Sequence, residues 1–572
     1  MEVTVKKAGI IPIALEFIES IELEKIFNSY IPSGKEEISH SQVLKVLLLN
    51  ILDDAQPLYG VSDWLSKYSD GIGSGLAHSE KYHDKRLSSS LDALFDSDRH
   101  SILMKLSTNA IQAHKLMTER VQNDLTRISF TGSYNNHGKL AEDLQITNGY
   151  HPTLKGNVKQ LVFGLSVTSD GHVPLWFDVY SGNTSDNTTH ANTWDNLKNL
   201  LKKTDFTYVA DSKLADKKDL ALIANNGGYF ITILPANRKE VKDFKKSLRS
   251  MNKTEWLKNR PCDWSLKYEP EKKDGQKNEQ KYRLKEGEKS QDNFPILWVY
   301  SESKAKKENE TRTKKIEKQL FLLAELNDKK INKRKLKTRE GIEDYLHTKL
   351  ANVSDYIDIQ ITEKEEVVKT KIGKGRIGAN SKFKETKKTK YHIDYKINED
   401  KIQNAARVDG LFPLIHNKET KPAVSILQEY KEQPYLENRF KALKSVLDVA
   451  PIFVEKIERI QAMLFLYFIA LMIIALIERR IRNNMVKKSI DKIAVLPQNK
   501  KTATPTWNAI RNLFSTIIHV IIKDENTNKT HSQVKGISEK HKVVLELLEI
   551  DIEKYQPDKQ DWWLQNKQFS FF

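Results

Sequence analysis

The sequence predicts an α/β protein, in which a mixed β-sheet flanked by helices lies between a helical N-terminal domain and a helical C-terminal tail. Three observations predict this class. Near residue 117 the spacing of apolar residues changes from a helical period to a strand period. Two β-rich runs then flank the turn sequence Ser169-Asp170-Gly171. After that turn, short apolar strands alternate with helical patterns, as they do in mixed sheets covered by helices.

The first segment, residues 1–115, shows helical periodicity interrupted by turn residues. Leu44, Leu47, Leu48 and Ile51 keep the i, i+3, i+4, i+7 spacing of one helix face, and Pro57 follows the break. We therefore expect a small helical domain here.

The second segment, residues 116–236, carries the first part of the predicted sheet. Short runs of β-branched and aromatic residues mark its strands, and apolar residues at helical spacing mark its helices. The expected strands are 126–130, 160–168, 173–180, 206–211 and 229–234, and the expected helices are 194–201 and 217–225.

The third segment, residues 237–405, differs in texture and is predicted to be a β-rich insertion with a charged surface. Fourteen Lys and Arg residues lie between Lys304 and Arg339. Strands are expected at 295–300 and 356–361, and a helical stretch near 316–326. A solvated charged face and a DNA-contacting face are both open interpretations of the lysines.

Residues 406–485 are predicted to complete the sheet domain, and residues 486–572 to form the helical tail. Ala462–Ile477 is a run of sixteen apolar residues, shorter than the roughly 20 that a membrane span needs. We interpret it as a buried central helix and expect no membrane contact. In the tail, helices are expected at 510–521 and 543–550.

The charge balance favours a polyanionic partner. The chain has 93 Lys and Arg against 76 Asp and Glu, a formal net charge of +17. Nucleic acid is the leading candidate, and a basic protein kept soluble by its charge is the alternative. Cys262 is the only cysteine, which excludes an intramolecular disulfide and a cysteine-based zinc site and fits a reducing cytoplasm.

Three carboxylates are candidates for a metal site. Two divalent ions about 3.5 to 4 Å apart can cut a phosphodiester when carboxylates bridge and flank them. Asp124 precedes a predicted strand, Asp211 ends another, and Glu437 lies in a late helix. Taken alone, each aspartate is more often a turn former or helix cap.

The late helix carries a pattern of polar residues. Tyr430, Gln433, Glu437 and Lys444 are separated by three, four and seven residues, which keeps them within one helix face. A carboxylate for metal would then share that face with groups able to grip phosphates. An exposed face of charge pairs is the alternative interpretation.

The stretch from Tyr430 to Lys444 resembles the Y-x2-R-x3-E-x6-K signature of the DDE transposases of bacterial insertion sequences. Gln433 departs from it, standing where the signature has arginine, and this removes a charge from the phosphate grip. Further segments resemble the family in the same order along residues 30 to 480. They are Asn123–Thr126, Lys159–Leu165, Gly182–Asp186, Val209–Leu214, Asp409–Phe412 and Val449–Phe453.

The resemblance implies an RNase H-like core split by the β-rich insertion. It implies two Mg²⁺ ions, for which Mn²⁺ can substitute, held by the catalytic residues Asp124, Asp211 and Glu437. It also implies that Tyr430, Gln433 and Lys444 contact transposon-end DNA. An insertion-domain tryptophan can stack on a flipped base in relatives, and Trp298 is the candidate here.

The function implied is a DNA transposase that binds terminal inverted repeats through its helical N-terminal domain, cleaves the element's ends and joins them to target DNA. A homodimer that pairs two ends, acting in the bacterial cytoplasm at the nucleoid, is expected. A transposase-derived DNA-binding regulator with weakened chemistry is the alternative. Glu119 could replace Asp124, and Asp186 could join the site, although we interpret Asp186 as a loop residue.

Overall fold

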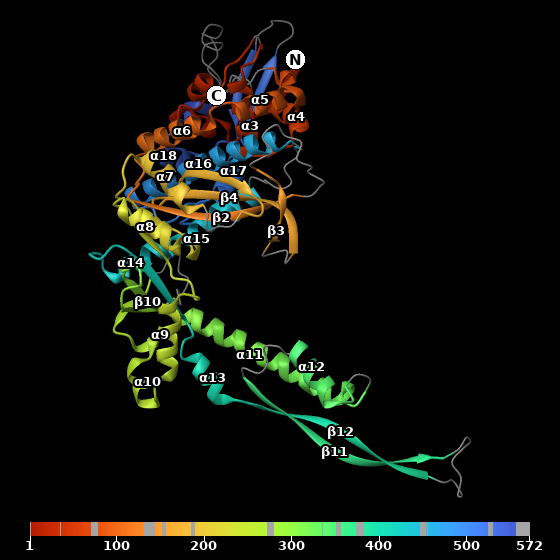
Figure 1. Ribbon diagram of the computed structural model, residues 1–572. Coiled ribbons are helices and arrows are strands. Elements are labelled where there is room, and N and C mark those ends of the chain that lie inside the picture. The colour runs from red at the N-terminus through yellow and green to blue at the C-terminus, as the bar shows by residue number, and fades with distance from the viewer. Residues whose placement is uncertain are drawn as a thin grey trace. The chain divides into compact units, whose positions relative to one another are not determined.

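The computed structural model consists of two compact units (Figure 1). Unit 1 comprises Met1–Thr232, His416–Lys421 and Ser425–Phe572, and unit 2 comprises Ile233–Ile415 and Pro422–Val424. The structure describes residues 2–34, 36–69, 78–130, 144–151, 156–184, 189–270, 280–333, 336–349, 356–372, 383–446, 454, 456–523 and 530–555.

The sheet of unit 1 is mixed, as the sequence predicts. β4 pairs antiparallel with β2, β3 and β5, whereas β2, β6 and β7 run parallel to one another. The hairpin expected around Ser169-Asp170-Gly171 is the β4–β5 pair. The strands are β2 (Arg120–Ser129), β3 (Thr147–His151), β4 (Gly156–Thr168), β5 (Pro174–Ser181), β6 (Thr207–Val209) and β7 (Tyr229–Ile233).

Helices cover this sheet. α7 (His190–Leu201) leads from β5 to β6 and α8 (Lys217–Asn225) leads from β6 to β7, and both confirm predicted helices. α6 (Arg99–His114) and α16 (Ile457–Lys487) pack against β5, while α15 (Gln433–Lys441) packs against β2. Apolar residues at helical spacing form these helices because burial against the sheet stabilises one face of each.

Helices dominate the N-terminal segment, as predicted. They are α1 (Ile11–Ser20), α2 (Leu23–Tyr30), α3 (His40–Asp53), α4 (Val61–Ser66), α5 (Asp84–Asp96) and α6. α3 begins with a capping box in which Ser39 accepts from the backbone N–H of Gln42 and the Gln42 side chain accepts from the backbone N–H of Ser39.

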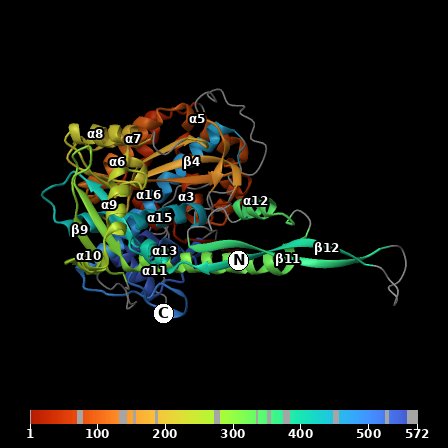
Figure 2. The ribbon, with the colours of Figure 1, turned by 60° about the horizontal axis from the view of Figure 1, so that its bottom comes forward.

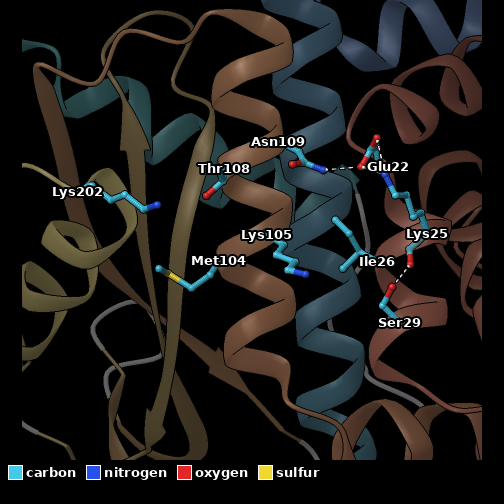
Figure 3. Close-up of a pocket in the computed structure, with 9 residues that line it drawn as sticks. All are labelled: Glu22, Lys25, Ile26, Ser29, Met104, Lys105, Thr108, Asn109 and Lys202. Atoms are coloured by element: carbon cyan, nitrogen blue, oxygen red, sulfur yellow. Dashed lines mark hydrogen bonds and ion pairs between the residues drawn. The ribbon is translucent and has the colours of Figure 1, made fainter.

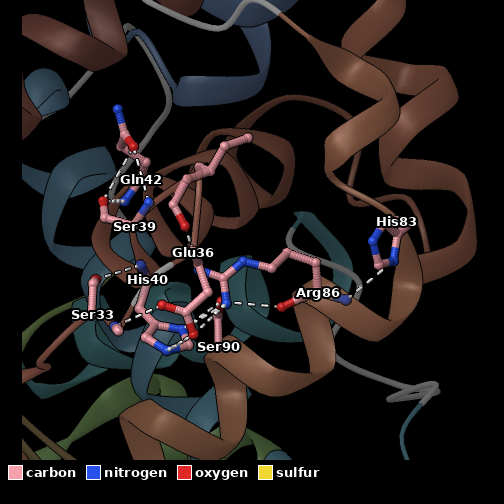
Figure 4. Close-up of polar contacts among 10 residues, drawn as sticks. Ser33, Glu36, Ser39, His40, Gln42, His83, Arg86 and Ser90 are labelled. Carbon is pink, nitrogen blue, oxygen red and sulfur yellow. Dashed lines mark hydrogen bonds and ion pairs between the residues drawn. The ribbon is translucent and has the colours of Figure 1, made fainter.

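A polar network joins the start of α3 to α5 (Figure 4). Nδ1 of His40 lies 3.0 Å from the Ser90 hydroxyl and 3.2 Å from a guanidinium nitrogen of Arg86. Glu36 lies near both side chains, 3.6 Å from His40 and 3.8 Å from Arg86. Burial and the Arg86 charge lower the pKa of His40, with Glu36 opposing them, so the ring serves this contact as a neutral hydrogen-bonding group.

The apolar run at 462–477 lies inside α16, which is 31 residues long. In the part of the chain that the structure describes, α16 is the one helix long and apolar enough to cross a membrane, and most of its apolar window is buried inside the protein. It contacts α1, α3, α5, α18 (Glu539–Leu548) and β5. An all-round apolar helix is stable here because unit 1 surrounds it, as the sequence interpretation expected.

The C-terminal prediction was partly wrong. The helix expected at 510–521 ends as α17 (Trp507–Phe514), and the residues after it form strands β14 (Ile518–Lys523) and β15 (Thr530–Lys535). β14 pairs with β15 and with β1 (Glu2–Lys7) at the other end of the chain. The β-branched run in β14 favours a strand once such partners exist, and no local pattern reveals a partner more than 500 residues away.

Unit 2 contains four strands of sheet: β8 (Leu266–Tyr268), β9 (Tyr282–Glu286), β10 (Ile296–Ser301) and β13 (Leu411–His416). A long two-stranded ribbon, β11 (Ile357–Lys371) with β12 (Phe383–Ile397), is seen in Figure 2. Buried residues at the root of the ribbon, including Ile357 and Ile393, pack with Ile316 and Leu323 of α11 (Glu302–Glu325).

The expectation of a β-rich segment understates the helices of unit 2. Besides α11, it holds α9 (Lys239–Ser250), α10 (Lys253–Asn259), α12 (Arg339–Lys349) and α13 (Glu399–Ala406). α11 is predominantly charged and buries only a narrow stripe, so its apolar period is weak in the sequence. Pairs such as Lys304 with Glu308, four residues apart, stabilise such a helix without an apolar signal.

Candidate active site

Asp124 lies on β2, and Asp211 follows the end of the neighbouring parallel strand β6. The register pairs Gln122 of β2 with Val209 of β6. Continuing it by two residues aligns Asp124 with Asp211, beyond the last paired residue of β6. Residues at matched positions of parallel strands point to the same face of a sheet. The two aspartates are therefore placed side by side, at the same edge of the sheet.

Local backbone contacts orient both carboxylates. One oxygen of Asp124 accepts a hydrogen bond of 2.8 Å from the N–H of Leu125. One oxygen of Asp211 accepts a bond of 3.0 Å from the N–H of Lys213 and caps a short 3₁₀ turn, Ser212–Ala215. The Asp211 backbone carbonyl accepts from the hydroxyl of buried Thr232. The Asp211 side chain is 42% exposed, so it is both held in place and open to a ligand.

A buried histidine faces Asp211. His190, the first residue of α7, is 2% exposed, and its Nε2 lies 4.0 Å from a carboxylate oxygen of Asp211. Its Nδ1 lies 3.2 Å from the hydroxyl of Tyr208 in β6. Burial lowers the pKa of His190 to about 4, so the ring is neutral at pH 7. The sequence prediction missed this residue, because a single histidine followed by an alanine carries no motif.

Tyr430 lies near both aspartates. Burial, followed by the negative charges of Asp211 and Asp124, raises the pKa of the Tyr430 phenol. Those charges act on the phenol only because both carboxylates lie within electrostatic reach. The structure thus brings three of the predicted site residues together, from β2, the turn after β6, and α14 (Ala423–Lys431).

Ion pairs tie α14 to β2. Arg120, the first residue of β2, pairs with Glu432 and lies 3.8 Å from Glu429. The buried amide of Gln122 donates to the backbone carbonyl of Glu429 at 3.5 Å. These contacts hold α14 beside the strand that carries Asp124, which explains the position of Tyr430.

The signature residues do not lie on one continuous helix. α14 ends at Lys431, α15 begins at Gln433 with Pro434 in its first turn, and a π-helical segment runs from Ala442 to Val446. Proline favours a helix start because it lacks an N–H and has a fixed φ. Tyr430 therefore precedes the helix of Glu437. Gln433 opens α15, and its side chain lies outside the described residues.

Glu437 is exposed on α15 and makes no hydrogen bond or ion pair with any residue that the structure describes. Over the described ranges, no three His, Cys, Asp or Glu side chains are placed together so as to hold a metal ion. Glu437 is thus not gathered with the aspartates, and its role as a third ligand stays a prediction. Without Glu437, Asp124 and Asp211 still offer carboxylate oxygens, which are the donors that Mg²⁺ and Mn²⁺ prefer. The chemistry of these two side chains therefore suits a shared divalent ion.

Lys444 lies in the π-helical segment, near Arg127 of β2. Partial desolvation, followed by the positive charge of Arg127, lowers the pKa of Lys444. Two cations held near each other repel, and an anion between them relieves that repulsion. The pair is therefore suited to a phosphate group, as the signature implies for Lys444.

A buried arginine anchors α15. Arg439 donates to Glu478 of α16 at 2.7 Å and to the backbone carbonyls of Gly171 and His172 at 2.7 and 3.0 Å. The other oxygen of Glu478 accepts from the backbone N–H of Trp507 at 2.9 Å. One guanidinium thereby joins the Glu437 helix to α16 and to the β4–β5 turn. The sequence does not reveal this anchor, because the burial of Arg439 depends on tertiary contacts.

One predicted residue and two alternative residues lie away from the aspartates or outside the described residues. Trp298 in unit 2 is 3% exposed and stacks on Phe244 with ring centroids 3.8 Å apart. Stacking of Trp298 on a base would require its ring to separate from Phe244, so that role stays a prediction. Exposed Glu119 precedes β2, five residues from Asp124, and Asp186 lies outside the described residues.

A groove of about 400 Å³ lies between α2 and α6 in unit 1 (Figure 3). Three lysines line it: Lys25, Lys105 and Lys202. Lys25 pairs with Glu22 at 3.0 Å, and the ammonium of Lys105 lies 5.0 Å from the ring centre of Tyr30. The groove is basic overall, but two of its cations already have partners.

Comparisons with known proteins give two findings. A family model described as a domain of unknown function, DUF4277, matches residues 3–108, which cover β1 and α1 to most of α6. This match spans less than half of the chain. No curated protein matches the chain.

Among solved structures, the chain is similar to a pre-cleavage Mos1 transpososome, with 11% sequence identity and a TM-score of 0.14. That match covers 35% of this chain and 60% of the other. A Mos1 transposase paired-end complex with the left transposon end matches at 11% identity and a TM-score of 0.13, covering 34% of this chain and 59% of the other. The chain thus spans about 60% of the length of these two proteins. TM-scores this low carry no argument about the fold.

Proposed function

We propose that this protein is a metal-dependent DNA transposase of the DDE class, which binds the ends of an insertion sequence, cleaves them and joins them to target DNA. The observation that carries the proposal is the matched placement of Asp124 and Asp211 on parallel strands, with Tyr430 within reach of both charges. The sheet order of unit 1 supports an RNase H-like core, because an antiparallel hairpin flanks the Asp124 strand on one side and parallel strands flank it on the other.

Asp124 and Asp211 would hold Mg²⁺ or Mn²⁺, and Glu437 would join them when DNA or metal binds. Glu437 would have to move towards the aspartates. It is exposed and has no hydrogen-bond partner among the described residues, so this movement breaks no hydrogen bond there. The bound ions would supply activation of the attacking oxygen and stabilisation of the leaving oxygen. Lys444 and Arg127 would hold a phosphate of the DNA beside the carboxylates.

Two copies of the chain, each holding one end, would act as a homodimer in the bacterial cytoplasm, at the nucleoid. The signature resemblance and the basic net charge support DNA as the partner. The groove lined by Lys25, Lys105 and Lys202 supplies a further basic surface in the N-terminal helices.

The decisive experiment is a cleavage assay on duplex DNA that contains the sequence flanking the native gene. We expect cutting with Mg²⁺ and none with EDTA. Asp211→Ala should abolish cutting while leaving DNA binding intact, because the lost carboxylate serves the metal.

Asp216→Ala is the matched control. Asp216 is also an aspartate that caps a helix, accepting from the N–H of Lys218 at 2.9 Å at the start of α8. Both variants lose a helix cap and a negative charge, so a difference in cutting between them reports a catalytic role of Asp211. Full Mg²⁺-dependent cutting by Asp211→Ala would refute the assignment of this residue.

A DNA-binding regulator with weakened chemistry is the second candidate. The observation that favours it is the separation of Glu437 from the aspartates over the described ranges. Tight binding of the flanking DNA without Mg²⁺-dependent cutting, in the wild-type protein, would select this candidate.

A further inference from the structure

His190 has a polar atom that the rest of the site leaves unsatisfied. Its Nε2 is buried and has no hydrogen-bond partner among the described residues. A buried polar group without a partner costs about 1–3 kcal/mol, so such groups are uncommon in folded proteins. The nearest acidic group is Asp211, at 4.0 Å, which is about 1 Å beyond hydrogen-bond distance.

Tyr208 determines which ring nitrogen carries the proton. Its hydroxyl is fully buried, and within the described part of the chain its one hydrogen-bond partner is Nδ1 of His190. A phenol that must donate somewhere donates to this nitrogen, which makes Nδ1 the acceptor. The single proton of the neutral ring then lies on Nε2 and points towards Asp211.

We propose that His190 is a positioning residue, which donates its Nε2–H to the Asp211 carboxylate when Asp211 binds a divalent cation. This proposal rests on the proposed function and deepens it. A movement of about 1 Å closes a chain from Tyr208 through His190 to Asp211. Carboxylates that ligate metals are themselves held by hydrogen bonds of this kind, which keep one lone pair aimed at the ion.

The position of the ring in the fold suits this role. His190 begins α7, and Tyr208 lies in β6, three residues before Asp211. Both side chains are fixed by elements of the sheet core and not by a surface loop. The carboxylate oxygen nearest to Nε2 also accepts from Lys213, so the bond from His190 would complete a pair of donors on that oxygen.

Two substitutions distinguish the role of Nε2 from that of Nδ1. His190→Gln places an amide N–H near the Nε2 position and loses the contact with Tyr208. His190→Asn keeps a polar atom near Nδ1 and removes the donor to Asp211. The measurement is the dissociation constant of Mn²⁺, followed by electron paramagnetic resonance of free Mn²⁺, on the full chain without DNA. Asp211→Ala identifies the signal that belongs to this site.

We expect His190→Asn to weaken Mn²⁺ binding by about 10-fold or more, and His190→Gln to stay near the wild-type value. Thermal unfolding of the metal-free variants checks that each is folded. If His190→Asn does not fold, Tyr208→Phe decides, because it unlocks the ring proton and should weaken Mn²⁺ in the same direction.

The outcomes separate this inference from the proposed function. Binding that depends on Asp211 but is unchanged in folded His190→Asn overturns the positioning role alone. Equal weakening in the Asn and Gln variants overturns it too, and indicates that His190 ligates the metal directly. Absence of any Asp211-dependent Mn²⁺ binding in the wild type overturns both proposals.

Discussion

The surroundings of a single side chain can fix its charge state, and half-buried His114 is an example. Its ring stacks on Phe17 with centroids 5.7 Å apart. Nε2 lies 3.0 Å from the Ser20 hydroxyl, and Nδ1 lies 3.3 Å from a guanidinium nitrogen of Arg480. A guanidinium can only donate, so Nδ1 must be the acceptor and the ring must be neutral. Burial, followed by Arg480 and Arg479, lowers the pKa of His114 to about 4.

This shift predicts how stability depends on pH. The unfolded chain binds a proton at His114 near pH 6.5, whereas the folded chain binds it only near pH 4. Between these values the unfolded state holds more protons, so the free energy of unfolding falls as the pH falls from about 6.5 to about 4. His114→Gln cannot titrate and should show a shallower fall over that window in urea unfolding. His78→Gln, at an exposed position, is the control and should keep the wild-type slope.

At the scale of elements, the position of α15 depends on contacts made outside the helix. α15 is short, has a proline in its first turn and continues into a π-helical segment, so its own backbone fixes it weakly. Arg439 supplies the missing constraint by binding α16 and the β4–β5 turn. Arg439 thus anchors the helix that carries Glu437, while Glu437 itself remains exposed to solvent.

Arg439→Ala should destabilise unit 1 by about 3–5 kcal/mol, because it leaves the buried Glu478 carboxylate without its main partner. Denaturant unfolding of the full chain measures this loss. Asn438→Ala, at the exposed neighbouring position of the same helix, should change stability by less than about 0.5 kcal/mol. Equal effects of the two substitutions would contradict the anchoring role of Arg439.

At the scale of the whole molecule, the net charge of +17 governs association with DNA. Each phosphate that a cation neutralises releases counterions, so the logarithm of the binding constant falls with the logarithm of salt concentration. Almost all of this net charge lies in residues 233–415 of unit 2, which hold 45 Lys and Arg against 30 Asp and Glu. In unit 1, Lys444 lies near Arg127 on the strand that also carries Asp124, and we expect this pair to bind a phosphate.

Lys444→Ala should weaken binding of end DNA and reduce the salt slope by about 1, as loss of one phosphate contact requires. Lys487→Ala, which removes an exposed charge at the end of α16, is the matched control and should leave the slope near the wild-type value. Fluorescence anisotropy over a salt series measures both. A slope unchanged by Lys444→Ala would count against a phosphate contact at this residue.

Local patterns in the sequence were sufficient for most of the sheet domain. The β4–β5 hairpin, α7, β6, α8 and β7 follow from turn residues and apolar periods, because those signals act over a few residues. The buried nature of α16 also follows from its composition. The pairing of β1 with β14 did not follow, because it depends on a distant partner. Of the helices in unit 2, only the 316–326 stretch of α11 was predicted, because the others have little apolar signal.

For the candidate site, the sequence by itself determined which residue types carry the chemistry: Asp124, Asp211, Glu437, Tyr430 and Lys444, through their signature. Only the tertiary structure decided that the two aspartates align on parallel strands, that Glu437 stands apart from them over the described residues, and that His190 faces Asp211. The physical reason is that register and burial arise from contacts between segments far apart in the chain. A local pattern records the conformation of its own residues and carries no information about those contacts.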